Sequence, residues 1–205
     1  MKKIRRVLLL SDGCNGAGEI LVQSLQEEYD IIWVTDKFVS HNYSPKVRII
    51  ICQNLWSLSL FVPVDAVIWA GRLGPMQAAD WQLEPLLKNI GRQQAFLVYL
   101  SVFQEAIAGI IADEEQQIIN SGIRYHILHL PELVFPQADC WLNKAIKSVL
   151  HKEQIVCTDL LCKPDFLWLD DAVQYLKKLL SLPAAENCIE KLTAKDKLTI
   201  QEMLI

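Results

Sequence analysis

The sequence predicts an α/β protein of three layers, with a doubly wound parallel sheet between two layers of helices. Two observations lead to this fold class. Short apolar runs of strand length alternate with longer segments of helix length along the chain. Hydrophobic residues also make up 52% of the composition, as expected for strands that are buried on both faces. Strands that alternate with helices favour a parallel sheet covered on both sides.

The apolar runs, among them VLLL, IIWV, AVIWA and FLVYL, each match the length of a buried strand. They predict strands at 5–11, 30–35, 47–52, 64–70, 95–101, 124–130 and 154–158. The intervening segments predict helices at 17–28, 77–90, 104–120, 140–151 and 171–181. Asp170 or Asp171 is a suitable N-cap for the helix AVQYLKKLL. Gly122 is placed to end the predicted helix at 104–120. We expect one domain, 1–205, in which the less regular residues 155–205 contribute a small C-terminal lobe.

The first strand runs into a glycine-rich turn, SDGCNGAG, which contains Gly13, Gly16 and Gly18. A helix and a second apolar strand follow, and that strand ends at Asp36. This order is typical of a Rossmann-type dinucleotide site, where the glycines let the backbone approach a pyrophosphate and the acid binds the ribose. A purely structural turn and a solvated Asp36 are the alternatives. Lys37 beside the acid would equally suit a 2′-phosphate, so the pattern predicts NAD or NADP without choosing between them.

The charge and composition of the chain limit the classes of partner that we expect it to bind. The net charge is -4 and the Lys and Arg residues are scattered, so we expect no nucleic-acid partner. No run approaches the ~20 apolar residues of a membrane span, and the apolar run near the N-terminus is too short for a signal peptide. None of the six cysteines forms a C-x-x-C pair. We therefore expect reduced thiols in a cytoplasmic protein with no membrane partner.

With these motifs in order, the chain resembles the short-chain dehydrogenase/reductase superfamily over about residues 5 to 202. SDGCNGAG is similar to its T-G-x-x-x-G-x-G turn. CQNLWSLSLF looks like its third-strand segment, which implies that Asn54 contacts adenine. VDAVIWAG looks like its fourth strand, which implies that Ala70 and Gly71 lie beside the cofactor. FLVYLSV looks like its fifth strand, which implies that Ser101 stands at the catalytic serine or threonine.

The second half resembles the extended and atypical (NmrA-like) branches of that superfamily. EEQQIINSGIRYHILHLPELVFP is similar to their segment of helix, small-Gly turn and I-L-R-P strand, which precedes the substrate site. FLWLDDAVQYLKKLL is similar to their V-x-D-V-A helix start, with Asp171 at the acid. LTIQEMLI resembles the beginning of their last helix.

The chain also departs from the family pattern. Asp12 replaces the first turn glycine, and a carboxylate there repels a pyrophosphate. The family's Tyr-x-x-x-Lys pair is absent, because its expected positions hold Ile107 and Ile111. The arginine of the I-L-R-P segment is His129. The usual proton donor for hydride transfer is therefore missing.

Ser101 and His129 are the remaining candidates for proton transfer, because both are expected at strand ends on the nicotinamide side of the cofactor. His126 and His129 form an H-x-x-H pattern, but residues three apart on a strand point to opposite faces, so we predict no metal site there. Two functions fit. One is an NAD(P)-dependent oxidoreductase or epimerase-like enzyme that acts on a small metabolite. The other is a non-catalytic family member that serves as a nucleotide sensor or as a binding or assembly protein. A homodimer or a protein partner remains open in both.

Overall fold

The computed structural model describes residues 3–11, 16–35, 42–52, 62–72, 83–102, 108–136, 138, 140–155, 157, 159, 161–182, 186–194 and 197–203. Its main element is a sheet of seven parallel strands: β1 (Arg6–Leu10), β2 (Asp30–Thr35), β3 (Val47–Ile51), β4 (Ala66–Arg72), β5 (Phe96–Val102), β6 (Arg124–Leu130) and β9 (Cys188–Lys191). The strand order is β3-β2-β1-β4-β5-β6-β9. The predicted parallel sheet is confirmed.

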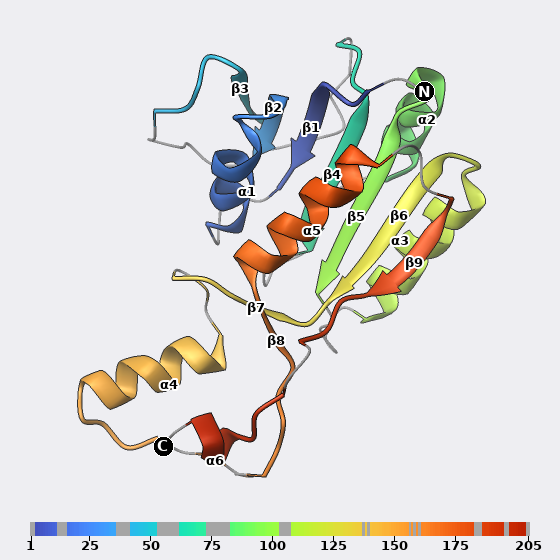
Figure 1. Cartoon of the computed structure of the whole chain (residues 1–205). Coiled ribbons are helices and arrows are strands. Elements are labelled where there is room, and N and C mark those ends of the chain that lie inside the picture. Colours follow the sequence, from blue (N-terminus) through green and yellow to red (C-terminus); the bar gives the residue numbers. More distant parts are fainter. Residues whose placement is uncertain are drawn as a thin grey trace.

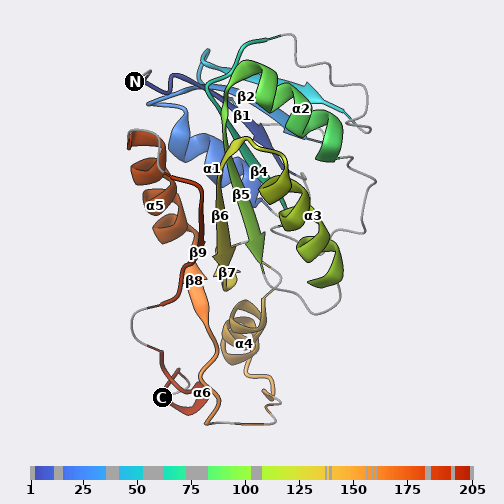
Figure 2. The same ribbon diagram turned by 90° about the vertical axis from the view of Figure 1, so that its right-hand side faces the viewer.

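Helices cover both faces of this sheet (Figures 1 and 2). α1 (Ala17–Leu25) and α5 (Leu169–Ser181) lie on one face, and α2 (Leu83–Gln93) and α3 (Ala108–Asn120) lie on the other. Each face has its own cluster of buried hydrophobic side chains. Successive residues of a strand point to opposite faces and so pack into different clusters, as Val7 and Leu8 of β1 do. The three predicted layers are therefore present, and none of the described helices is both long and apolar enough to span a membrane.

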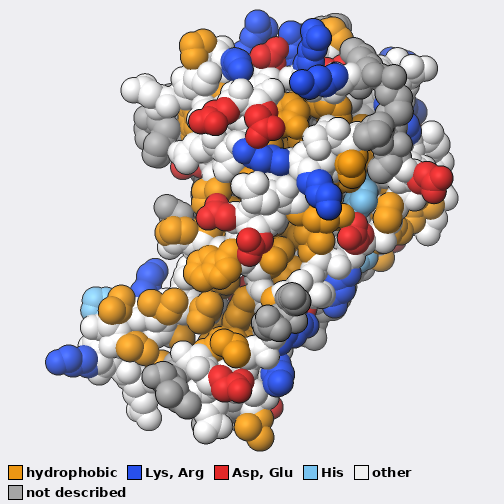
Figure 3. Space-filling view, in the orientation of Figure 1, with side chains coloured by type: hydrophobic (Ala, Val, Ile, Leu, Met, Phe, Trp, Pro, Cys, Tyr) orange, Lys and Arg blue, Asp and Glu red, His pale blue; other side chains and the backbone are white. Residues whose placement is uncertain are grey.

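A smaller unit lies beyond the carboxyl ends of the main strands (Figure 1). It contains a two-stranded parallel sheet of β7 (Glu132–Val134) and β8 (Phe166–Trp168), together with α4 (Trp141–Leu150) and α6 (Ile200–Met203). Hydrophobic side chains gather on its surface and where it meets the main sheet (Figure 3). Two large hydrophobic side chains of this unit are exposed, Trp168 of β8 by 57% and Leu150 of α4 by 74%.

Two local predictions were wrong. Residues 154, 155 and 157 lie in no strand, and the seventh strand of the sheet is β9 instead. β9 is an edge strand that alternates half-buried and exposed residues, so it lacks the continuous apolar run of a buried strand. Asp170 and Asp171 do not cap α5, because the helix begins at Leu169 with Trp168 as its N-cap. Both carboxylates lie in the first turn instead, where the helix dipole favours negative charge.

Candidate functional site

The strand order reverses direction at β1, which pairs with β2 on one side and with β4 on the other. Open α/β sheets bind ligands in the crevice outside the carboxyl ends of the strands at such a point. The glycine-rich segment joins β1 to α1 at this point. The topology therefore places the predicted dinucleotide segment at the position where this fold binds ligands.

Gly16 ends that turn and caps α1. Its backbone has φ 73° and ψ -13°, which is the left-handed region that glycine adopts without a steric penalty. It makes no side-chain cap to the helix. The Gly16 carbonyl accepts a hydrogen bond of 3.1 Å from Ile20 N–H, but glycine has no side chain that could accept from the earlier N–H groups of α1, which suits an anion at the helix N-terminus.

Gly18 allows α1 to pack directly against the end of β1. A Cβ at this position would lie 2.2 Å from Ser11 Oγ and 3.0 Å from Ser11 Cβ. Ser11 is 1% exposed, and its Oγ accepts a hydrogen bond of 2.8 Å from Trp33 Nε1. Close packing of helix and strand is the role of the last glycine in a dinucleotide turn. The geometry of Gly16 and Gly18 thus fits a dinucleotide.

The other predicted cofactor residues are described only in part. Ala70 is buried in β4, and Gly71 follows it in the same strand at the carboxyl edge. Gly13, Asp36 and Asn54 lie outside the described residues, as does Asp12.

The two predicted catalytic residues lie together. Ser101 and His129 are paired across β5 and β6, and both line a cavity of about 480 Å³ at the carboxyl ends of these strands. A larger hollow of about 650 Å³ lies at the amino ends of the strands, around Val64 and Arg124. Because ligands of open α/β sheets bind at the carboxyl edge, we place the candidate active site in the smaller cavity.

His129 has a charged partner inside this cavity. Its Nε2 lies 2.8 Å from Glu115 Oε1, and the two side chains are 39% and 15% exposed. A carboxylate that fixes one ring nitrogen orients the imidazole, and such a pair can hold and pass a proton. Ser101 is only 2% exposed, so its hydroxyl borders the cavity from the sheet.

Glu115 was not among the predicted site residues. Two adjacent glutamates on a helix are most simply expected to be solvated, but Glu114 is buried and Glu115 is half-buried. Glu114 is 6% exposed and accepts a hydrogen bond of 2.6 Å from the Tyr99 hydroxyl. The helical period could have indicated their burial. Glu114 and Glu115 lie three or four residues from Ile111 and Ile118, which are both buried, so all four share one face of the helix.

Two further residues shape the chemistry of the cavity. Ile111, at the position where the resemblance expects the lysine, contributes an apolar wall. Ile107 lies outside the described residues. Lys191 lines the cavity from β9, as the register partner of His129. It was missed because β9 itself was not predicted, and it supplies a cation that suits an anionic ligand.

The two histidines of the H-x-x-H pattern point to opposite faces of β6, as predicted. His129 contacts Glu115 of α3, whereas His126 contacts Glu190 of β9 on the side covered by α5. They cannot ligate one ion together.

No protein-family model and no curated protein matches the chain. Solved structures align over nearly its whole length. MoeE5 in complex with UDP-glucuronic acid and NAD is 17% identical, with 95% of this chain and 79% of that chain covered and a TM-score of 0.74. The UDP-N-acetylglucosamine 4-epimerase from Methanobrevibacter ruminantium M1, in complex with UDP-N-acetylmuramic acid, is 15% identical, with coverages of 99% and 80% and a TM-score of 0.76. The Bordetella bronchiseptica enzyme WbmH in complex with NAD+ is 12% identical, with coverages of 98% and 79% and a TM-score of 0.75.

At identities of 12% to 17%, this likeness concerns the fold alone. The chain shares the α/β architecture of enzymes that were crystallised with NAD or with nucleotide sugars.

Proposed function

We propose that the chain is an NAD(P)-binding protein of the short-chain dehydrogenase/reductase type. The observation that carries this proposal is the geometry of Gly16 and Gly18 at the point where the strand order reverses. The fold shared with NAD-bound enzymes supports it. The atypical, NmrA-like character inferred from the sequence belongs to the same proposal.

The dinucleotide would lie in the crevice at the carboxyl ends of β2, β1 and β4. The glycines would approach the pyrophosphate, the acid would bind the ribose, and the remaining residues would flank the adenine and nicotinamide halves. The full set is Gly13, Gly16, Gly18, Asp36, Asn54, Ala70 and Gly71. A bound nicotinamide would supply hydride transfer.

For the reaction, we propose oxidoreductase or epimerase-like chemistry on a small metabolite held in the cavity of Ser101 and His129. Glu115 would orient His129, and His129 would carry the proton that the family's tyrosine normally handles. Lys191 would attract an anionic part of the substrate. Because the solved neighbours include complexes with UDP-sugars, nucleotide sugars are the first substrates to test.

The test is turnover of a panel of carbonyl compounds, alcohols and nucleotide sugars, followed at the nicotinamide absorbance. We expect Ser101→Ala and His129→Ala each to lower the rate, whereas His151→Ala, at an exposed histidine after α4, leaves it unchanged. Robust turnover in both cavity variants would mean that the active site lies elsewhere.

The second candidate is a non-catalytic nucleotide sensor or assembly protein. Ile111 favours it, because an apolar side chain occupies the cavity wall where the resemblance expects a lysine. Measurable nucleotide binding without turnover of any substrate in the panel would support this candidate. In either case we propose one domain, 1–205, to which residues 155–205 contribute a small substrate lobe. A cytoplasmic location and a homodimer or protein partner remain predictions.

A further inference from the structure

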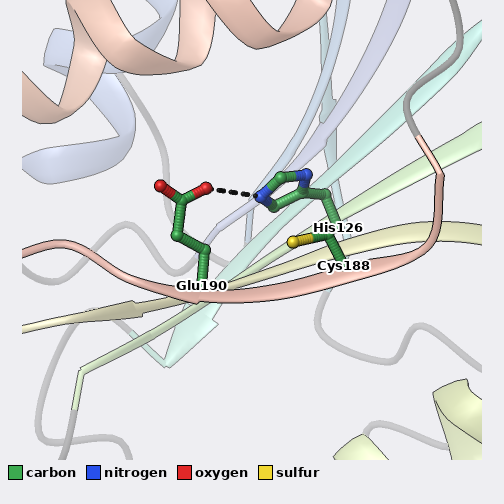
Figure 4. A group of neighbouring side chains, drawn as sticks. All are labelled: His126, Cys188 and Glu190. Atoms are coloured by element: carbon green, nitrogen blue, oxygen red, sulfur yellow. Dashed lines mark hydrogen bonds and ion pairs between the residues drawn. The ribbon is translucent and has the colours of Figure 1, made fainter.

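A second cluster of chemically active side chains lies on the face of β6 opposite to His129. His126, Cys188 and Glu190 point toward one another there (Figure 4). Each offers one ligand atom, and these atoms all lie within 4.8 Å of one another. The cluster takes no part in the function proposed above.

The pairing of β6 with β9 builds this cluster. His126 is the register partner of Cys188, so the two residues lie side by side on neighbouring strands. Glu190 is two residues beyond Cys188, and residues two apart on a strand share a face. Three donors of different chemistry are therefore held on adjacent strands by the backbone register.

The internal contacts of the cluster leave one buried atom unsatisfied. His126 is 4% exposed, and its Nε2 lies 3.2 Å from Glu190 Oε2. The Tyr175 hydroxyl of α5 donates to the same oxygen. Within the described part of the chain, His126 Nδ1 has no hydrogen-bond partner. Because Nε2 is the ring nitrogen beside Glu190, Nε2 is the atom that could bind an ion here, and Nδ1 would then carry the ring proton.

We propose that His126, Cys188 and Glu190 bind a zinc ion. Imidazole nitrogen, thiolate sulfur and carboxylate oxygen are the three donor types that Zn²⁺ takes in proteins. At ordinary bond lengths, tetrahedral ligands lie about 3.3–3.6 Å apart across the ion. The separation of 3.2 Å between His126 Nε2 and Glu190 Oε2 is close to this range. Small side-chain rotations of Cys188 and Glu190 would close the remaining distance.

The position of β9 makes the site accessible. β9 is the edge strand of the sheet, and both Cys188 and Glu190 are half-buried, so an ion can enter from solvent. Tyr175 would hold the carboxylate of Glu190 in place, in the way that outer hydrogen-bond partners orient metal ligands. Three protein ligands leave one coordination position open for water or for another ligand.

The experiment is a titration of tag-free, chelator-treated protein with Co²⁺, which reports thiolate ligation by a sulfur-to-metal charge-transfer band, followed by displacement with Zn²⁺. We expect one equivalent to bind with this band, and Zn²⁺ to remove it. Cys188→Ser should abolish the band, and Glu190→Gln should weaken binding by about 10-fold or more. The matched control is Cys162→Ser, because Cys162 is an exposed free thiol. It should leave the band intact.

The half-buried residues Cys188 and Glu190 are better test positions than the buried His126, and circular dichroism checks that each variant is folded. Absence of a charge-transfer band in the wild-type protein would overturn the proposal. A band that survives Cys188→Ser, or that disappears in Cys162→Ser, would equally overturn it.

Discussion

Replacing Gly18 by alanine tests the packing on which the proposed dinucleotide crevice depends. The new Cβ would lie 2.2 Å from Ser11 Oγ and 3.3 Å from the Trp33 ring, so either α1 or Ser11 must move. Overpacking costs ~1–3 kcal/mol, and loss of the buried bond from Trp33 Nε1 to Ser11 Oγ costs a similar amount. Because both effects act through Ser11, we expect a combined loss of about 2–4 kcal/mol in the free energy of unfolding.

Urea unfolding followed by tryptophan fluorescence measures this loss. Gly109→Ala is the matched control, because Gly109 is exposed near the start of α3 and nothing lies within 4 Å of the added Cβ. It should be neutral or stabilise the protein by up to ~1 kcal/mol. In a Ser11→Ala background, Gly18→Ala should cost less, since the contact with Oγ is gone. Equal midpoints for Gly18→Ala and Gly109→Ala would refute the reasoning.

Three further outcomes are expected. If the protein turns over a substrate, Glu115→Gln should lower kcat by about 10–100-fold and leave KM nearly unchanged, because the carboxylate that orients His129 is lost. An unchanged kcat would exclude this positioning role. Burial and the Glu190 carboxylate raise the pKa of Tyr175 from 10.0 to about 12, so only the unfolded state ionises in that window and stability should fall as pH rises through it. Between pH 10 and 12, the urea midpoint should fall less in Tyr175→Phe than in the wild-type protein. An equal fall in the two proteins would show that Tyr175 is not the group responsible. Gly122→Ala should cost ~1–2 kcal/mol in unfolding free energy, because its φ of +72° is strained for alanine although the space is open.

The fold was predictable from the sequence because its central strands are buried on both faces. Runs such as AVIWA and FLVYL carry that burial directly. β9 was not predictable in this way, because an edge strand buries only part of its surface and its CIEK sequence has no apolar run. The small sheet of β7 and β8 was missed for a related reason, since strands of three residues give too short a pattern.

The candidate site was predictable only where one segment carried the signal. Gly16 and Gly18 could be found because the turn, the helix and the strand follow one another in the sequence. The pair of His129 and Glu115 joins α3 to β6, and its contact depends on how these elements pack. Cys188 and Glu190 meet His126 through a strand register that no local pattern encodes. Contacts between distant segments therefore needed the structure.

The most direct test of the central claim is calorimetric titration of the purified protein with NAD(H) and NADP(H), together with mass spectrometry of any nucleotide that co-purifies. We expect weak binding to the wild-type protein and tighter binding to Asp12→Gly, because that change removes a carboxylate and a Cβ from the pyrophosphate turn. Absence of binding to both proteins at millimolar nucleotide would contradict the account.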